Sequence, residues 1–325
     1  MKYLSLNIQF FIAFSFFMTG GNLNADAQSL ISDKLEGKCV KILRDVLETQ
    51  SEWVKVHAAE YLLWAGYPQG VRQTFQNEEK QFGKEPRYRI GIWRVLAQAA
   101  NNLDDKKVWT DKILQAFLDT NGIDRIHAAE TLAKLSISPL QKAPVITARS
   151  ITSSDKNLAL YTRWSVSFYS ADSLKAAQRY FFDLLMSGAG DLSERKLVAF
   201  VVRNLGGLTV SEWNKLSRKA LTQAAGSEAG IYLLSTSFVT APESCIKSNS
   251  FQQIKRKLLK YQNSPDKSDR IEMITALSEK GTKNDLPVLI SLLDNENPLG
   301  NGADNADVKA SAANAILKIT KRKYY

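Results

Sequence analysis

The segment VKVHAAEYLL (54–63) returns in altered form as DRIHAAETLA (124–133), and these two segments hold both histidines of the chain. A basic residue precedes each histidine by two places, and two alanines follow it. A third copy, VKASAANAIL (308–317), keeps the basic residue and the two alanines but has serine in place of histidine. Recurrence of one pattern in separate parts of a chain indicates a structural repeat rather than a pair of catalytic sites.

Basic residues in the same setting recur at intervals of about 32 to 39 residues, with one interval about twice as long, which is typical of helical repeats. These basic anchors are Lys55, Arg89, Arg125, Arg163, Arg195, Arg270 and Lys309. A second apolar segment with helical periodicity lies between anchors, for example VWTDKILQAFLDT (108–120). Each unit is therefore a pair of helices that buries its apolar faces against the next pair. We predict an all-α protein, a right-handed α-solenoid of about seven to eight stacked helix pairs.

The N-terminus predicts export. Lys2 precedes the apolar run FFIAFSFFM (10–18), which is shorter than the roughly 20 residues that span a bilayer. The sequence Ala-Asp-Ala at 25–27 fits a cleavage signal, so we expect residues 1–27 to be a signal peptide cut after Ala27. Residues 28–325 would then form the solenoid of a periplasmic or secreted protein, with no transmembrane span after cleavage. An uncleaved anchor helix is the alternative.

The charge and the cysteines limit the partners and the cross-links. The chain carries a formal net charge of +10 at pH 7, which favours acidic partners such as anionic glycans, lipid headgroups or nucleic acid. Export argues against nucleic acid. Cys39 and Cys245 are the only cysteines, and the repeats place them on distant units. We therefore expect two buried thiols rather than a disulfide, which needs Cα atoms within roughly 7 Å of each other.

The C-terminal copy carries a family resemblance. The helix LPVLISLLDNE (286–296) followed by ADVKASAANAILKI (306–319) resembles a HEAT repeat of the phycobilisome-lyase type. The copies are sharp near 38–66, 108–135 and 286–319 and degenerate over 140–260. The resemblance implies that the second helix of each pair lines a concave face. It also implies that the basic anchors are structural and reach an acid in the neighbouring loop.

A metal site in the repeats is the competing interpretation. One HEAT-like family, deoxyhypusine hydroxylase, holds iron with His-Glu dipeptides, whereas here Ala58 and Ala128 follow the two histidines. Each histidine shares a helix face only with the glutamate three residues further on, which is too few ligands for a metal site. The sequence also has no nucleophile motif, phosphate-binding glycine loop or zinc spacing. We therefore predict no catalytic residue, no metal and no cofactor.

The predicted binding site follows from helical geometry. Positions two, five and nine residues after each anchor fall on one helical face, and this column is mostly polar although its neighbours are apolar. Its first three rows form the predicted site: His57, Glu60, Trp64, Arg94, Gln98, His127, Glu130 and Lys134, with Gly91 among them. The later rows are Ser165, Phe168, Asp172, Leu197, Phe200, Asn204, Glu272, Thr275, Glu279, Ser311, Asn314 and Lys318. Trp64 is the informative member, because an aromatic side chain on a polar face favours a ligand over a merely solvated surface.

These observations predict an interaction module rather than an enzyme. We expect a monomeric, non-catalytic scaffold of the bacterial cell envelope that binds a protein partner through its concave face. A carbohydrate-binding accessory protein of a glycan-utilisation system is the alternative, suggested by Trp64, Tyr61 and the positive charge. An unrecognised HEAT-like enzyme is the third possibility.

Overall fold

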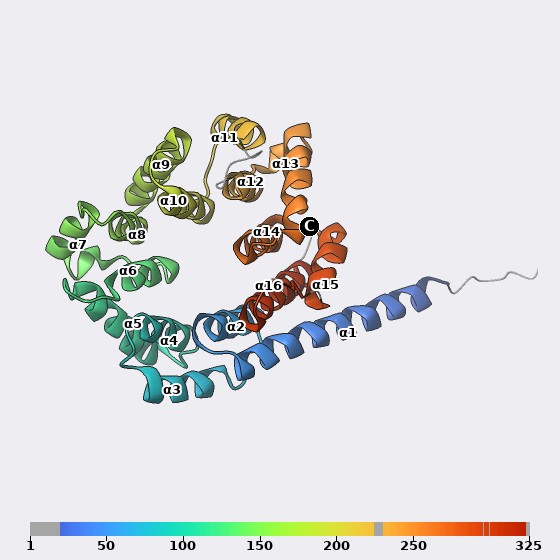
Figure 1. The fold of residues 1–325 in the computed structure, drawn as a ribbon, viewed down its shortest axis with the longest axis horizontal. Helices are drawn as coiled ribbons and strands as arrows, with labels where there is room; N and C mark the ends of the chain where they lie inside the picture. The colour runs from blue at the N-terminus through green and yellow to red at the C-terminus, as the bar shows by residue number, and fades with distance from the viewer. Residues whose placement is uncertain (1–19, 224–229, 295, 299, 323–325) are drawn as a thin grey trace, which may run out of the picture.

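The described part of the chain is entirely helical. The computed structural model describes residues 20–223, 230–294, 296–298 and 300–322, and within them it contains α-helices and short 3-10 turns but no strand. The helices follow one another in pairs and form two rows, an outer and an inner one (Figure 1). The prediction of an all-α protein built from helix pairs is therefore confirmed.

Odd-numbered helices make the outer row and even-numbered helices the inner row (Figure 1). The outer helices are α1 (Gly20–Thr49), α3 (Val71–Phe82), α5 (Leu103–Leu118), α7 (Pro144–Ile151), α9 (Ala171–Ser187), α11 (Val210–Gln223), α13 (Asn249–Leu259) and α15 (Leu286–Asp294). The inner helices are α2 (Glu52–Trp64), α4 (Tyr88–Gln98), α6 (Arg125–Lys134), α8 (Lys156–Val166), α10 (Leu192–Leu205), α12 (Gly230–Val239), α14 (Lys267–Lys280) and α16 (Gly302–Lys321). The 3-10 turns are Pro139–Gln141, Glu243–Cys245, Lys260–Asn263 and Lys283–Asp285.

The row of pairs closes into a ring. Each inner helix packs on the next one, and α16 packs on α14, α1 and α2, so the last pair meets the first (Figure 1). Across this junction Lys38 Nζ lies 2.6 Å from a carboxylate oxygen of Asp294, and Lys321 Nζ donates to the carbonyl oxygen of Ala65 at 2.9 Å. The repeats predicted stacked pairs, but they did not predict that the stack returns to its start.

Small residues set the close packing of the inner helices. The alanine pairs Ala58–Ala59 and Ala128–Ala129 are completely buried, as is the pair Ala312–Ala313 in α16. Gly91 in α4 serves the same purpose: a Cβ atom there would lie 3.0 Å from Val56 Cγ2 and 3.1 Å from Trp53 Cζ3. These contacts are tighter than nearly all real Cβ contacts, so a larger residue would force the Val56 and Trp53 side chains to shift by a few tenths of an ångström.

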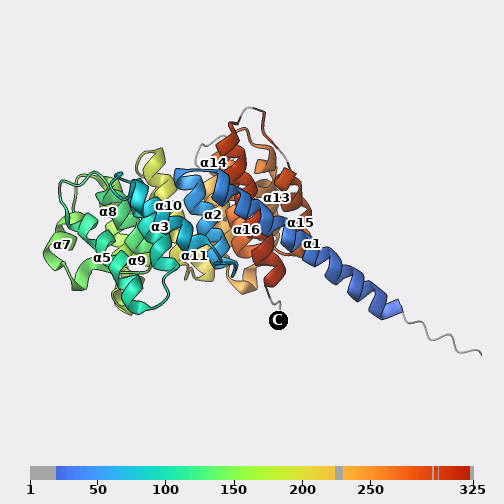
Figure 2. The same ribbon diagram turned by 90° about the horizontal axis from the view of Figure 1, so that it is seen from below.

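The structure describes only part of the predicted signal peptide, residues 1–27. Residues 1–19, which hold the apolar run of the predicted signal peptide, lie outside the described residues, and the predicted cleavage after Ala27 falls within α1. The first turns of α1 project beyond the ring, while its later turns pack on α2 and α16 (Figure 2). Among the described helices none is long and apolar enough to cross a membrane.

Both cysteines are free and buried, as predicted. Cys39 lies in α1 and Cys245 in the 3-10 turn Glu243–Cys245, on separate helix pairs of the ring. Burial raises the pKa of the Cys39 thiol to about 12, with Lys38 opposing the shift. Cys39 therefore stays a neutral, small apolar side chain at physiological pH.

Candidate functional site in the centre of the ring

The inner helices enclose a cavity of about 560 Å³. Its lining comes from seven of them, α2, α6, α10, α14 and α16 with one residue each of α4 and α8, and from residues that follow α6 and α8. The lining includes His57, Glu60, Tyr61, Trp64, Gln98, Lys134, Trp164, Phe168, Phe200, Asn204, Thr275, Ser278, Glu279, Ser311, Asn314 and Lys318. Residues that are far apart in the sequence meet here only because the ring is closed.

The predicted column supplies much of this lining. Of the predicted site, His57, Glu60, Trp64, Gln98 and Lys134 line the cavity. His127 and Glu130 instead line an adjoining cavity of about 440 Å³, which shares Lys134 and Phe200 with the first. Arg94 lines neither cavity and lies buried behind Glu60. Gly91 is a packing position between α2 and α4.

Asp172 was assigned to the column wrongly. Helix α8 ends at Val166, so a count of nine residues from Arg163 runs out of that helix. Asp172 lies in the first turn of the outer helix α9 and is exposed. The count assumed one continuous helix after every anchor, and α8 is too short for that.

Several lining residues were not in the predicted column. Ala133 and Ser278 stand eight places after their anchors, and Tyr61 and Trp164 flank the column on their own helices. Position eight lies beside position five on a helical wheel, because three residues make nearly one turn. A face that added position eight to positions two, five and nine would have included Ala133 and Ser278.

The centre of the predicted site is a buried ion pair. Arg94 Nε and Nη2 donate to the two carboxylate oxygens of Glu60 at 2.7 and 2.9 Å, and Gln98 Nε2 donates to Glu60 at 2.7 Å. Trp64 Nε1 in turn donates to Gln98 Oε1 at 2.8 Å. Glu60 and Arg94 both stand five places after their anchors, so neighbouring repeats bring opposite charges face to face. Such a two-point arginine–carboxylate contact fixes both side chains.

Glu60, Glu130 and Arg94 keep their charges at neutral pH. Burial by itself would raise the pKa of Glu60, but the charge and hydrogen bonds of Arg94 hold that pKa below its ordinary value. The pKa of Glu130 is also lowered, because Lys134, His127 and Arg94 outweigh its burial. Burial would lower the pKa of Arg94, but Glu60 and then Glu130 raise it. Both glutamates are therefore ionised at neutral pH and cannot donate a proton as general acids.

The two histidines do not form a joint site. His57 Nδ1 lies 2.9 Å from Asp307 Oδ1 across the ring junction, and beside it Tyr61 Oη lies 3.2 Å from Ser311 Oγ. The His127 ring lies 5.6 Å from the Trp53 ring, and its Nδ1 is 3.8 Å from Glu130. Within the described residues no group of three or more histidine, cysteine, aspartate or glutamate side chains could hold a metal ion.

Trp64 presents an aromatic surface to the cavity. It is the last residue of α2, and 61% of its surface is exposed although its indole N–H is already bonded to Gln98. Its ring packs at 5.7 Å against Tyr61, and Phe200 faces the same cavity beneath the Lys134 ammonium, 5.8 Å away. The aromatic faces, rather than their polar edges, remain available for contact with a ligand.

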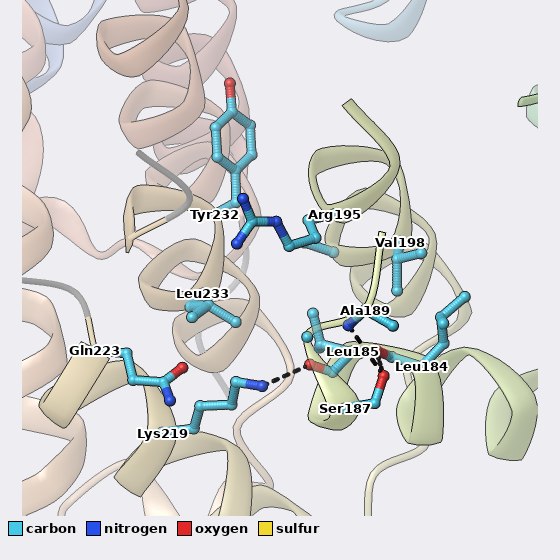
Figure 3. Close-up of a pocket in the computed structure, with 12 residues that line it drawn as sticks. Leu184, Leu185, Ser187, Ala189, Arg195, Val198, Lys219, Gln223, Tyr232 and Leu233 are labelled. Carbon is cyan, nitrogen blue, oxygen red and sulfur yellow. Dashed lines mark hydrogen bonds between the residues drawn. The ribbon is translucent and has the colours of Figure 1, made fainter. Parts of the chain in front are cut away.

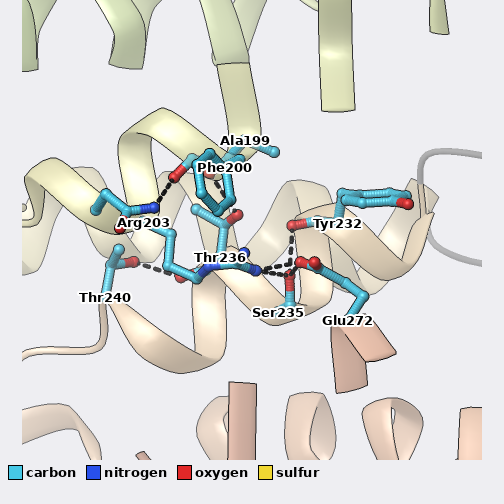
Figure 4. A network of polar contacts seen from close by, with 9 residues as sticks. Ala199, Phe200, Arg203, Tyr232, Ser235, Thr236, Thr240 and Glu272 are labelled. Atoms are coloured by element: carbon cyan, nitrogen blue, oxygen red, sulfur yellow. Dashed lines mark hydrogen bonds and ion pairs between the residues drawn. The ribbon is translucent and has the colours of Figure 1, made fainter. Parts of the chain in front are cut away.

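A second buried polar cluster lies among the inner helices α10, α12 and α14 (Figure 4). Arg203 of α10 pairs with Glu272 of α14, and Ser235 of α12 bonds to both of them. Thr236 donates to the carbonyl oxygen of Ala199 at 3.0 Å. The column contained Glu272, but Arg203 stands eight places after its anchor and was not predicted. The cluster ties three consecutive inner helices together.

Three basic anchors contact carboxylates. The pairs are Lys55–Glu78 at 2.7 Å, Arg89–Asp124 at 2.6 Å and Lys309–Glu296 at 2.7 Å. Asp124 and Glu296 lie in loops that precede an inner helix, whereas Glu78 belongs to α3. The Lys55 and Arg89 contacts join an inner helix to the next helix pair, and the Lys309 contact joins α16 to the loop that precedes it.

The other four anchors make no carboxylate contact within the described residues. Arg125 donates to the carbonyl oxygen of Phe117 at 2.9 Å and to a serine hydroxyl. Arg163 lies over the ring of an outer tyrosine, 4.1 Å from its centre. Arg195 and Arg270 have buried guanidinium nitrogens without a hydrogen-bond partner. The expected acid is thus missing at Arg163 and Arg195 in the degenerate part, at Arg270 just beyond it, and also at Arg125, where the repeat is sharp.

The fold and the site define a class: a ring of helix pairs around a cavity whose wall is aromatic and polar. Comparison of the chain with family models, curated proteins and solved structures finds no match. The functional inference therefore rests on the geometry of the cavity.

Proposed function

We propose that the protein is an exported, non-catalytic binding module, a HEAT-like solenoid closed into a ring, that holds its ligand in the central cavity. The observation that carries this proposal is the exposed face of Trp64 within a cavity of about 560 Å³ lined by polar side chains. Cavities of about 300 to 1,000 Å³ are typical of small-molecule sites. The anchors at Lys55, Arg89 and Lys309 are structural in this proposal.

A carbohydrate is the occupant that this geometry favours over a folded protein domain. Because α16 packs on α2, the inner helices surround a cavity of about 560 Å³, which is the size of a small-molecule site and too small for a folded domain. A sugar ring offers an apolar face to an aromatic side chain and hydroxyl groups to polar neighbours, which matches a wall that combines Trp64 with Asn204, Thr275 and Asn314.

The charges in the wall favour a neutral glycan over an anionic one. Lys318 Nζ lies 2.7 Å from Glu279, and Lys134 Nζ lies 2.7 Å from Glu130. Each of these lysines is therefore neutralised by its own carboxylate, so the wall offers hydrogen bonds without a strong net charge. The overall charge of +10 is distributed over the rest of the molecule.

Titration of tryptophan fluorescence with neutral oligosaccharides tests this proposal. We expect saturable quenching, and the Trp64→Ala variant should lose at least tenfold in affinity because the stacking surface is gone. Trp109→Ala is the matched control, since Trp109 lies on the outer helix α5 beside Lys112. Equal affinity in wild type and Trp64→Ala, or the absence of a response to every neutral glycan, would contradict the central site.

A protein partner remains a second proposal, and exposed apolar side chains on the outer surface support it. Leu103 and Val108, both on α5, are 83% and 53% exposed. Apolar side chains on a free surface can mark a protein contact. A stoichiometric protein that co-purifies with wild type and with Trp64→Ala, but not with a Leu103→Ser, Val108→Ser variant, would place the partner there. Loss of that protein in Trp64→Ala would instead place it at the central cavity.

Export is tested directly by the mass of the protein recovered from the cell envelope. Cleavage after Ala27 should leave a chain that begins at Gln28. A chain that keeps residues 1–27 would show an uncleaved anchor.

A further inference from the structure

A third cavity lies between the outer helices α9 and α11 and the inner helices α10 and α12 (Figure 3). Its volume is about 220 Å³, and it is distinct from the central cavity. Two cationic side chains reach it, Arg195 from α10 and Lys219 from α11, and no carboxylate of the described residues lines it. A small cavity that two cations line attracts an anion, because an opposite charge offsets the cost of burying them.

One nitrogen of Arg195 is buried without a partner. Its Nε is shielded from solvent and has no hydrogen-bond partner. At the equivalent position of an earlier repeat, Arg89 reaches Asp124 at 2.6 Å. Buried donors are nearly always bonded, and an unmade bond to a charged group costs about 1 to 3 kcal/mol or more. The packing of the described residues therefore leaves Arg195 Nε without a partner.

Lys219 has a structural partner but still contributes charge. Its Nζ donates to the carbonyl oxygen of Leu185 at 3.0 Å (Figure 3) and to that of Met186 at 2.7 Å, at the C-terminal end of α9. Burial lowers the pKa of Lys219, and the positive charge of Arg195 lowers it further. Both cations line the same cavity, so an anion bound there would be attracted to both.

The remaining wall of the cavity is both polar and apolar. Ser187 and Gln223 supply neutral hydrogen-bonding groups, while Leu185, Val198 and Leu233 supply apolar surface. An inorganic ion would use only the charged side of such a space. A compact anion attached to a small apolar group would use both sides.

We propose that this cavity binds a small organic phosphate ester, with the phosphate between Arg195 and Lys219 and the apolar group against Leu185, Val198 and Leu233. Arginine is well suited to phosphate, because its planar guanidinium can donate two parallel hydrogen bonds to it. This site is independent of the proposed glycan site, since the two cavities share no lining residue.

Isothermal titration calorimetry with phenyl phosphate, inorganic phosphate and benzyl alcohol tests the proposal. Phenyl phosphate should bind, inorganic phosphate should bind more weakly, and benzyl alcohol should give no signal. Arg195→Gln should weaken phenyl phosphate at least tenfold, whereas Arg163→Gln should leave it unchanged. Arg163 is the matched control because it is a basic anchor that lies over Tyr180 outside this cavity.

Gln223→Glu provides a second variant that is not expected to harm folding, because Gln223 is exposed at the end of α11. A carboxylate there would compete for the two cations and should also weaken phenyl phosphate at least tenfold. The proposal is overturned if phenyl phosphate gives no heat at millimolar concentration, if both variants bind it as wild type does, or if benzyl alcohol binds equally well. A circular dichroism melt of each variant establishes that the compared proteins are folded.

Discussion

The two HAAE segments are alike in sequence but differ in what surrounds them. Their alanines behave identically, since all four are completely buried between helices. Their polar residues do not, because α2 lies at the junction where the ring closes and α6 lies between two ordinary neighbours. The repeat thus determines the packing of the small residues, while the neighbouring helices determine the chemistry of the polar ones.

The histidines show this difference most directly. His57 reaches Asp307, a residue 250 positions away in the sequence, because α16 returns to α2. His127 has no such neighbour and lies against Trp53 of α2. The same side chain in the same tetrapeptide therefore joins the ends of the chain in one copy and packs on an adjacent repeat in the other.

The glutamates differ in the same way. Glu60 is only 6% exposed and meets Arg94 of the next repeat, whereas Glu130 is 18% exposed and meets Lys134, one turn further along its own helix. An arginine at position five of a neighbouring repeat makes an inter-helix pair. A lysine at position nine of the same repeat makes an intra-helix pair, which contributes less to the fold.

The largest expected effect separates these two glutamates. Glu60→Ala leaves the buried Arg94 charge unpaired and should lower the free energy of unfolding by about 3 to 5 kcal/mol. Glu130→Ala should lower it by about 1 kcal/mol, because Lys134 can turn to solvent. Urea denaturation of both variants measures the difference. Equal losses of unfolding free energy in the two variants would show that Glu60 and Glu130 contribute equally, which would contradict the difference between the two segments.

A smaller effect tests the ring junction. Asp307→Ala removes the buried partner of His57 and should cost about 2 kcal/mol, the scale of a hydrogen bond to a charged group. Hydrogen exchange should then become faster in α2, although the substitution is in α16. Asp304→Ala is the control, because Asp304 pairs with Lys267 at 2.6 Å and not with α2. Unchanged exchange in α2 of the Asp307 variant would argue against closure.

Acid should weaken both segments through their glutamates. The pKa values of Glu60 and Glu130 in the folded protein lie below the ordinary value of 4.5. As the pH falls below about 4.5, the unfolded chain takes up these protons first, so stability decreases with falling pH. Unfolding free energies between pH 5 and 3 should fall less steeply in Glu60→Gln and in Glu130→Gln than in wild type. Parallel curves for all three proteins would mean that neither glutamate is responsible.

The smallest effects concern the position two places before each anchor. Trp53 holds it in the first copy and contacts His127 and Arg94, while Ile123 holds it in the second and is 66% exposed. Trp53→Leu should cost about 1 kcal/mol through its lost ring contacts. Ile123→Ala should change stability by less than about 0.5 kcal/mol. A thermal melt of each variant measures the change in stability. A larger loss in Ile123→Ala than in Trp53→Leu would contradict this ranking.

Part of the candidate site was predictable because helical periodicity is local. Counting two, five and nine residues from an anchor placed His57, Glu60 and Trp64 on one face, and these three do line the central cavity. The same count failed at Asp172, because it takes no account of where α8 ends. The count also omitted Arg203, which stands eight places after its anchor, and it gave no sign that the partner Glu272 comes from an inner helix two pairs further along.

By itself the sequence determined that the chain forms helix pairs, that the alanines are buried and which face of each inner helix is polar. Each of these follows from residues within one or two turns of each other. Only the tertiary structure decided that α16 meets α2, that Glu60 meets Arg94 and that the polar faces enclose a cavity. Closure depends on the small rotation between successive pairs, added around the ring. That rotation is set by side-chain packing at every interface, which no single repeat encodes.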